Sequence, residues 1–354
     1  MNEAKLVYKN LDELFERAPS FPINKKSKFV IFSDLHMGDG SSKDDFLPNS
    51  NLFIQSVRDY YIPKGFSMVL NGDIEELQRF SLKKIAKQWA EVYELFDEIN
   101  KNNLLIKTVG NHDLTLVTEP EQPFQYELYE SAKLMYKDNP IFIFHGHQAS
   151  KKYQKSNRLI GFTLKYIANP LRIKNFSVAH DSRKQYKIER RVYNYSVFNK
   201  IASVIGHTHR PLFESLSKAE RLKYKIEQLC RELVGLKEGE EPLILKSIKA
   251  YKKELKAIYS KKLPILEIGN LYHSIFHIPV LFNSGTVIGK RGITCLEIEN
   301  GSISLIHWFD QKTTEKYLRQ TGYNPEQLGD TDFYRMVINK EDLDYIFTRI
   351  KVLS

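Results

Sequence analysis

The sequence predicts an α/β fold. Short apolar runs bounded by polar residues are typical of buried strands, and such runs lie at 29–32, 68–70, 104–106, 141–144 and 202–205. A segment with helical periodicity separates the second run from the third. Strands that alternate with helical segments indicate the α/β class.

Two helices are expected before residue 100. Residues 3–17 form an amphipathic pattern that ends before Pro22. In residues 82–99, apolar side chains recur at three- and four-residue spacing, which places them on one helix face. They are Leu82, Ile85, Trp89, Tyr93, Phe96 and Ile99. Ser81 stands where a serine side chain can cap the first turn.

The pattern changes to a hairpin near the C-terminus. Apolar residues at 293–298 and 303–308 flank Asn300 and Gly301, a strong signal for a tight turn between antiparallel strands. Residues 312–354 are polar, and we expect a tail with helical stretches such as 343–352.

Residues 213–265 look inserted. Ser217 and Glu220 form a capping box. Leucine and isoleucine then recur at alternating four- and three-residue steps, the pattern of a paired-helix seam. We therefore expect a helical hairpin that projects from the core, with its turn at Gly235, Gly239 and Pro242.

Length and composition narrow the class of protein. The 354 residues are enough to bury a substantial core, and no apolar run approaches the ~18 residues of a membrane-spanning helix. The N-terminus has no apolar segment typical of a secretory signal. Two cysteines cannot build a disulfide framework. We therefore expect a cytoplasmic protein.

The positive charge is concentrated in two segments. The chain carries 53 basic and 43 acidic residues, a net charge of +10. Residues 151–195 hold twelve Lys and Arg against two acids, and residues 217–262 hold thirteen against seven. A basic excess favours an anionic partner, such as a phosphate, a nucleic acid or an acidic lipid. For 217–262, a solvated helical face explains the charge equally well.

Polar residues that carry chemistry follow each predicted strand. Open α/β sheets place their binding crevices at these strand ends, and six of the ten histidines fall there. In chain order the clusters are Asp34-Leu35-His36, Gly72-Asp73, Gly110-Asn111-His112-Asp113, His145-Gly146-His147 and Gly206-His207-Thr208-His209. One such cluster is weak support for a site, but five at successive strand ends predict one.

These clusters offer carboxylates, imidazoles and one side-chain amide, but no thiolate. Divalent metals that accept mixed nitrogen and oxygen ligands fit this set, namely Mn²⁺, Fe or Zn²⁺. Seven ligands exceed what one tetrahedral centre uses. Two metals ~3.5–4 Å apart that share a carboxylate would use them, and such pairs serve in-line displacement at phosphorus.

The ordered motifs D-x-H, G-D, G-N-H-D, H-G-H and G-H-T-H are similar to those of the calcineurin-like metallophosphoesterase superfamily. The match extends from about 29 to 308. It implies a four-layer αββα sandwich of two mixed sheets. The domain would span 1–311, with a cap at about 150–198 and the hairpin at about 213–265; the tail at 312–354 would follow.

The resemblance also assigns roles to the candidate residues. The two metals, Mn²⁺ most readily, would be held by Asp34, His36, Asp73, Asn111, His145, His207 and His209, with Asp73 shared. A hydroxide that bridges them would attack phosphorus in line. His112 would stabilise the phosphoryl oxygens or protonate the leaving group. Either Asp113 or Glu76 would orient His112.

Substrate specificity is expected to depend on the cap. Arg183, Lys187 and Arg191 share one face if their segment is helical, and can hold phosphate charge. His147 either contacts substrate or the metal ligands, or is structural. A cap in this position resembles the branch that contains UDP-2,3-diacylglucosamine hydrolases, as does the spacing of Asp73 and Glu76. That branch carries Arg where this chain has His112.

The expected function is therefore a metal-dependent phosphoesterase that acts on a phosphoester or pyrophosphate, with a nucleotide or lipid-linked substrate. Two alternatives stay open: a metal-dependent nuclease, and a non-catalytic binding scaffold. Nucleic acid, peripheral membrane contact and oligomerisation through the hairpin at 213–265 are further partners that the charge pattern allows.

Overall fold

A computed structural model describes residues 3–119, 124–150, 182–216, 218–234, 241–260, 276–314, 318 and 323–354. Most of the expected cap, the capping residue Ser217 and the hairpin turn at 235–240 lie outside the described residues. No helix within the described ranges combines the length and the apolar character needed to cross a bilayer.

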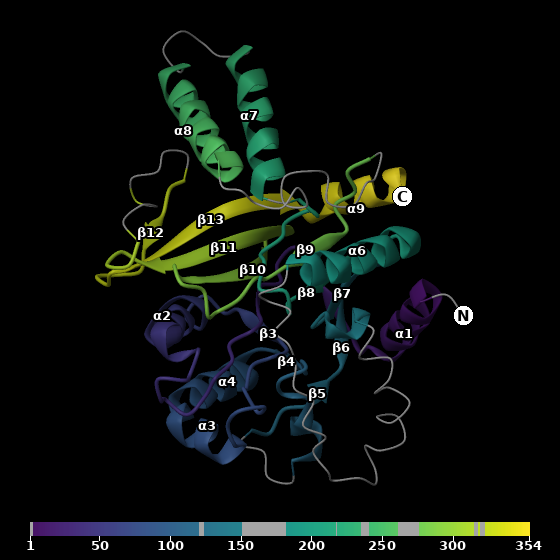
Figure 1. Ribbon diagram of the computed structural model, residues 1–354, viewed down its shortest axis with the longest axis vertical. Helices are drawn as coiled ribbons and strands as arrows, with labels where there is room; N and C mark the ends of the chain where they lie inside the picture. The colour runs from purple at the N-terminus through teal and green to yellow at the C-terminus, as the bar shows by residue number, and fades with distance from the viewer. Residues whose placement is uncertain are drawn as a thin grey trace.

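The described strands form two mixed sheets (Figure 1). In order, the larger sheet contains β12 (Glu326–Gln327), β13 (Phe333–Asp342), β11 (Ser302–Asp310), β10 (Ile293–Glu299), β2 (Phe29–Phe32), β3 (Ser67–Asn71), β4 (Leu105–Thr108) and β5 (Leu128–Tyr129). Strands β2 to β5 are parallel, whereas β10, β11, β12 and β13 pair antiparallel. The parallel half supplies three of the five candidate loops.

The smaller sheet has the order β1 (Ser20–Ile23), β6 (Ser131–Tyr136), β7 (Asn139–Phe144), β8 (Ala202–Ile205) and β9 (Leu281–Asn283). Strands β7, β8 and β9 are parallel to one another, and β6 runs antiparallel to β7. The ends of β7 and β8 therefore bring the two histidine-rich motifs to one edge of this sheet.

Alternating side chains on the strands divide the apolar core. On β2, Val30 and Phe32 pack with α2 (Ser50–Ser56), α3 (Leu82–Gln88) and α4 (Ala90–Asn102). Ile31 points the other way and joins the smaller sheet in the second core cluster.

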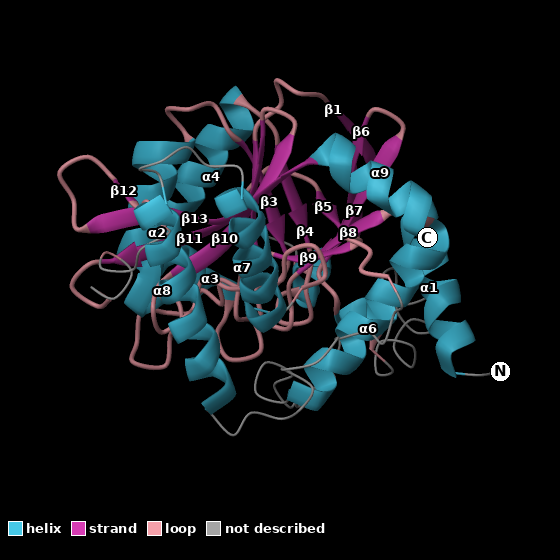
Figure 2. Cartoon of the chain, turned by 90° about the horizontal axis from the view of Figure 1, so that it is seen from above, coloured by secondary structure: helices cyan, strands magenta, loops and turns pink. Residues whose placement is uncertain are grey.

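The helices cover the outer faces of the two sheets. Helices α1 (Glu3–Arg17) and α6 (Ser182–Asn199) pack beside β6 and β8, on the side away from α2, α3 and α4 (Figures 1 and 2). The predicted α/β sandwich of two mixed sheets is thus confirmed.

The strands that are apolar on both faces were the most predictable. The runs at 29–32 and 202–205 coincide with β2 and β8, and the other three fall within or overlap β3, β4 and β7. The predicted tight turn joins β10 to β11: Asn300 has φ of 54° and Gly301 has φ of 72°, and Glu299 pairs with Ser302. Positive φ at both turn residues matches a type I′ turn.

The single helix expected over 82–99 is wrong in one respect, because it breaks into α3 and α4. Trp89 stands between them with φ of −109° and ψ of 33°. Its indole Nε1 donates to Asp44 Oδ2 at 3.0 Å, a tertiary contact that helical periodicity cannot reveal. Ser81 occupies the expected cap position of α3, but its side chain makes no capping hydrogen bond.

The helical tail expected at 312–354 is also partly wrong. Strands β12 and β13 occupy part of it, and β13 extends the larger sheet beside β11. Only three of the ten residues of β13 are buried, so its polar residues hide the strand pattern. Helix α9 (Leu343–Leu353) follows as expected, and Asp342 caps it by accepting from the amide of Tyr345.

Two helices stand where the inserted hairpin was expected. Helix α7 (Lys218–Val234) packs against α8 (Glu241–Ser260), and the pair projects beyond β13 (Figure 1). Lys225 Nζ donates to the carbonyl of Ile338 on β13 at 2.7 Å, which ties the base of the pair to the larger sheet. The remaining short helices are η1 (Leu47–Asn49), η2 (Val57–Tyr61), η3 (Leu114–Thr118) and η4 (His147–Ala149).

Candidate metal centre

The five sequence motifs lie on loops that follow β2, β3, β4, β7 and β8. Parallel strands that point the same way bring the residues after them to one edge. The structure accordingly gathers six of the seven candidate ligands into two close groups, in each of which the ligand atoms lie within 4.8 Å of one another. The groups are Asp34 with His36 and His209, and Asp73 with His145 and His207.

The two groups adjoin each other. His209 Nε2 lies 3.0 Å from Asp34 Oδ1, and His145 Nε2 lies 3.0 Å from Asp73 Oδ2. His36 connects them, because its Nε2 lies 3.9 Å from an oxygen of each carboxylate. All of these carboxylate oxygens and imidazole nitrogens therefore face one small volume.

Asn111, the seventh candidate ligand, presents an orphaned atom. Its Oδ1 is buried and makes no hydrogen bond with any described residue. An unsatisfied buried acceptor costs about 1–3 kcal/mol, and a divalent cation would satisfy it. Together with the carboxylates and imidazoles, this amide oxygen fits a site for metals of the Mn²⁺, Fe or Zn²⁺ type.

Five of the seven candidate ligands have a left-handed backbone. The φ angles of Asp34, His36, Asp73, His207 and His209 lie between 49° and 62°. For residues other than glycine such a conformation costs on the order of 1 kcal/mol or more, and it persists only where the surrounding fold enforces it. At these five positions the strained backbone lies in sharp turns after the strands.

Glycines let the loops approach the ligands closely. A Cβ on Gly206 would lie 2.6 Å from Asp34 Oδ2, and one on Gly72, which has φ of 76°, would lie 2.6 Å from His145 Nδ1. Any larger residue at these positions would displace a candidate ligand. Gly72 and Gly206 are therefore packing requirements.

The buried acids and imidazoles of the candidate centre shift one another's pKa values. Burial favours the neutral form of Asp34 and Asp73, but neighbouring histidines outweigh it and lower the pKa of both carboxyls. Burial also disfavours charge on His145, yet Asp73 and Asp34 raise its pKa to about 10. For His207, burial and the nearby His145 lower the pKa to about 3. Divalent cations would take the place of protons among these ligands.

His112 is held by Glu76 at the edge of the centre. Its Nδ1 lies 2.9 Å from Glu76 Oε1 and 2.8 Å from Oε2, while its amide donates to Asp73 Oδ1 at 2.7 Å. Its side chain retains 22% exposure, more than His36 or His145. Burial opposes a charge on this imidazole, but Asp73 and Glu76 raise its pKa to about 9.

Of the two carboxylates expected to orient His112, the geometry favours Glu76. Glu76 also lies 3.0 Å from His36 Nδ1, so it connects His112 to a candidate ligand. Asp113 is fully buried and accepts instead from the amides of Ile74 and Gly110. It therefore joins the 73–76 loop to the 110–113 loop, and burial raises its pKa to about 7.

The expected substrate residues lie on α6 and beside β7. Arg183 and Lys187 are exposed, whereas Arg191 Nη1 donates to the carbonyl of Ala149 at 2.9 Å. His147 is buried, with its ring centroid 5.5 Å from that of His145. Contact of these side chains with a substrate stays a prediction, as does the extent of the cap, since 151–181 lie outside the described residues.

One supporting residue was missed by the sequence analysis. Glu189 on α6 is fully buried, accepts from Thr208 Oγ1 at 2.8 Å and forms an ion pair with Arg210. It thereby fixes the loop that carries His207 and His209. Its signal was present, because it is one of only two acids among the twelve basic residues of 151–195.

Comparisons with known proteins add little to these observations. No protein-family model matches the chain, and no curated protein matches it in sequence. A crystal structure of a conserved uncharacterised protein from Streptococcus pneumoniae TIGR4, described as a predicted phosphoesterase, is a weak structural neighbour. The two chains are 14% identical, the match covers 79% of this chain and 87% of the neighbour, and the TM-score is 0.29. A likeness of that size carries no argument, so the chain's own residues carry the assignment.

Proposed function

We propose that this chain is a calcineurin-like metallophosphoesterase that hydrolyses a phosphoester or pyrophosphate bond with two divalent metal ions. The observation that carries the proposal is the convergence of two ligand groups, centred on Asp34 and Asp73, beside a histidine that contacts neither carboxylate through its ring. A purely structural cluster has no need of an orphaned amide oxygen or five strained ligand residues.

The donor set divides between two ions around Asp73. The first would be held by Asp34, His36, His209 and Asp73, and the second by Asp73, Asn111, His145 and His207. When bound, two such ions supply Lewis-acid stabilisation of a phosphoryl group and lower the pKa of water. Mn²⁺ suits this mixed set of nitrogen and oxygen donors, and Fe or Zn²⁺ are the alternatives.

His112 supplies the proton and positive charge that the reaction needs. Asp73 and Glu76 both favour the protonated imidazole, and Glu76 is not one of the assigned metal ligands. Glu76 fixes the ring through Nδ1. Nε2 is therefore the ring nitrogen that contacts the substrate. The cation stabilises charge on the phosphoryl oxygens or donates its proton to the leaving oxygen, a contribution of roughly 10²–10⁴ in rate.

The test is hydrolysis of a substrate panel by purified protein supplied with Mn²⁺. The panel contains an aryl phosphomonoester, an aryl phosphodiester, a nucleotide diphosphate-sugar and single-stranded DNA. We expect metal-dependent turnover of at least one ester, reduced roughly 10²–10⁴-fold in His112→Ala with the bound metal retained. His277→Gln, a histidine remote from both ligand groups, is the matched control and is expected to retain full activity.

Two outcomes would contradict the proposal. If the protein binds two metals but hydrolyses nothing in the panel, the binding-scaffold alternative is the better account. If His112→Ala loses the metals, His112 is a ligand and the assigned division of roles is wrong. Turnover of the DNA alone would favour the nuclease alternative, which uses the same metal-dependent hydrolysis of a phosphodiester.

A further inference from the structure

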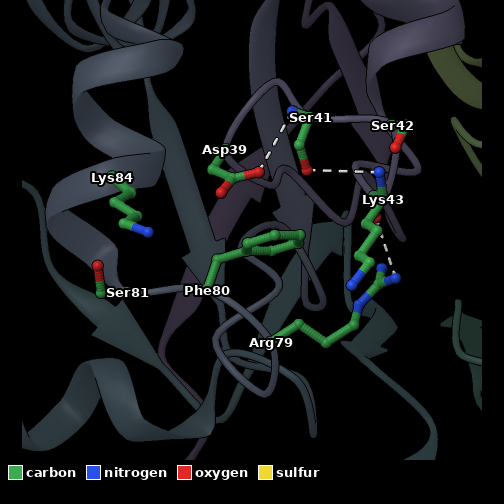
Figure 3. Close-up of a pocket in the computed structure, with 8 residues that line it drawn as sticks. All are labelled: Asp39, Ser41, Ser42, Lys43, Arg79, Phe80, Ser81 and Lys84. Atoms are coloured by element: carbon green, nitrogen blue, oxygen red, sulfur yellow. Dashed lines mark hydrogen bonds between the residues drawn. The ribbon is translucent and has the colours of Figure 1, made fainter.

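A second feature of the molecule is a cavity of about 680 Å³ between the loop after β2 and the segment that leads into α3 (Figure 3). Ligand pockets for small molecules typically measure about 300–1,000 Å³. Its walls combine cations, hydroxyls and one aromatic ring, contributed by Asp39, Ser41, Ser42, Lys43, Arg79, Phe80, Ser81 and Lys84. None of these residues belongs to the motifs that define the metal centre.

The cavity adjoins the metal centre through shared elements. Arg79, which lines it, places Nη2 3.5 Å from Glu76 Oε2, and Glu76 holds His112. The same segment is fastened to the next loop, because Gln78 Nε2 donates to the carbonyl of Asn111 at 3.0 Å. A substrate whose phosphorus lies at the metal centre can therefore extend toward this cavity.

Phe80 is fixed in place by close packing. A Cβ on Gly38 would lie 2.7 Å from Phe80 Cε2, so the ring lies against the loop that carries His36. Figure 3 shows this ring in the middle of the cavity, between Lys84 and Asp39 on one side and Lys43 and Arg79 on the other. The ring is partly exposed, and the Arg79 guanidinium lies 5.5 Å from its centroid. Partly exposed aromatic rings and arginine side chains together form stacking platforms for nucleobases, regardless of sequence.

The charges around the ring favour an anion. Arg79 is already paired with Asp45 and Glu76. Lys43 and Lys84 are both exposed, and no other described residue forms an ion pair within 4 Å of either. A hydrogen bond with Ser41 lowers the pKa of the Asp39 carboxyl, and Lys84 is nevertheless near enough to contribute to that lowering. The one acid in the wall, Asp39, accepts from the amide of Ser41 at 3.2 Å. Two lysines and neighbouring hydroxyls are suited to a phosphate group.

We propose that this cavity binds the nucleotide portion of the substrate, with the base stacked on Phe80 and a phosphate contacted by a lysine beside the ring, Lys43 or Lys84. This inference rests on the proposed phosphoesterase function and deepens it, since it assigns the substrate to nucleotide esters. A free nucleotide ester and the terminal nucleotide of a strand share this chemistry.

The experiment compares two Mn²⁺-dependent substrates. The nucleotide ester is the β-(p-nitrophenyl) ester of thymidine 5′-diphosphate, whose second phosphate and nucleoside can reach the cavity while the reacting phosphorus lies at the metal centre. The methyl ester is methyl p-nitrophenyl phosphate, which has neither group. In Lys43→Gln/Lys84→Gln, we expect KM for the nucleotide ester to rise about tenfold or more, with hydrolysis of the methyl ester changed less than about twofold. Phe80→Leu should likewise weaken only the nucleotide ester.

The matched control is Lys83→Gln/Lys87→Gln. These lysines are exposed on α3, carry the same charge and do not line the cavity. We expect both substrates to be hydrolysed by this variant as by the unaltered protein. Equal losses for the cavity variant and the control would overturn the proposal, because bulk charge would then explain the effect.

Calorimetric binding to the full chain gives a readout that is independent of turnover. We expect AMP to bind more tightly than ribose 5-phosphate, and Phe80→Leu to abolish the difference. If the two ligands bind alike, base stacking is overturned. If AMP binding depends on Phe80 and on Lys43 or Lys84 while neither ester is hydrolysed, the cavity proposal stands and the proposed function fails. Competition by a DNA oligonucleotide at concentrations where AMP does not compete would assign the cavity to strand ends rather than free nucleotides.

Discussion

A buried ion pair behind the metal centre provides the sharpest test of how the fold supports the site. Lys107 on β4 and Glu75 beside Glu76 are both fully buried. Lys107 Nζ lies 2.9 Å from Glu75 Oε1 and 2.7 Å from Oε2, and Tyr93 Oη donates to Oε1 at 3.0 Å. The pair thus fastens the 73–76 loop to β4 and, through it, to the loop that carries His112.

Replacement of Lys107 by Met removes the cation and leaves the Glu75 carboxylate buried. Loss of one partner of a buried pair typically costs about 3–5 kcal/mol, because the remaining charge is uncompensated. Removal of both charges together, in Lys107→Met/Glu75→Leu, avoids that cost. We therefore expect the double variant to be more stable than Lys107→Met alone.

The assay is urea denaturation followed by circular dichroism, with the free energy of unfolding extrapolated to water. Lys9→Met is the matched control, since Lys9 forms a pair with Glu13 that is largely exposed on α1, and we expect no measurable change. A Lys107→Met variant as stable as the control would refute the reasoning. The reasoning would also be refuted if the double variant lost as much free energy of unfolding as Lys107→Met and Glu75→Leu lose in sum, because the two side chains would then not be coupled.

Two further predictions concern the site and the stability of the fold. Glu76→Gln should retain the metals but lower kcat about 10–100-fold, since Glu76 orients His112 and contacts His36; unchanged kcat would exclude that role. Burial lowers the pKa of His307 to about 4, below the ~6.5 of an exposed histidine, so the unfolded chain binds the proton first. Stability from His307 is complete above pH 6.5 and is lost as the pH falls to about 4, so His307→Gln should reduce the stability difference between pH 7 and 4.5 by about 2 kcal/mol. An unaltered pH dependence of urea unfolding would contradict this prediction.

The sequence predicted an element best where burial alone determines its residue pattern. Strands β2 and β8 are apolar on both faces because they lie between covered sheet faces, so their bounds could be predicted from local pattern. At the break between α3 and α4, Trp89 donates to Asp44, which is 45 residues away and outside any local pattern. Strand β13 is mostly only partly buried and therefore carries no continuous apolar run.

The candidate site shows the same division. Its ligand types and their order could be predicted, because each motif follows a strand. The choice between Glu76 and Asp113 could not, since both are near His112 in the chain or the fold and only geometry separates them. The cavity that contains Lys43 and Lys84 joins two segments about forty residues apart, and neither segment has a motif of its own.

Metal stoichiometry of the purified chain and of Asp73→Asn tests the central claim most directly. Asp73 contacts His145, and its carboxylate also lies near His36, so it is the group that the proposed function assigns to both ions. Mass spectrometric analysis of metals should find close to two transition-metal ions per unaltered chain. Asp73→Asn should lose metal and phosphoesterase activity together, because the shared anion is removed. One tightly bound ion per chain, unchanged in Asp73→Asn, would contradict the account.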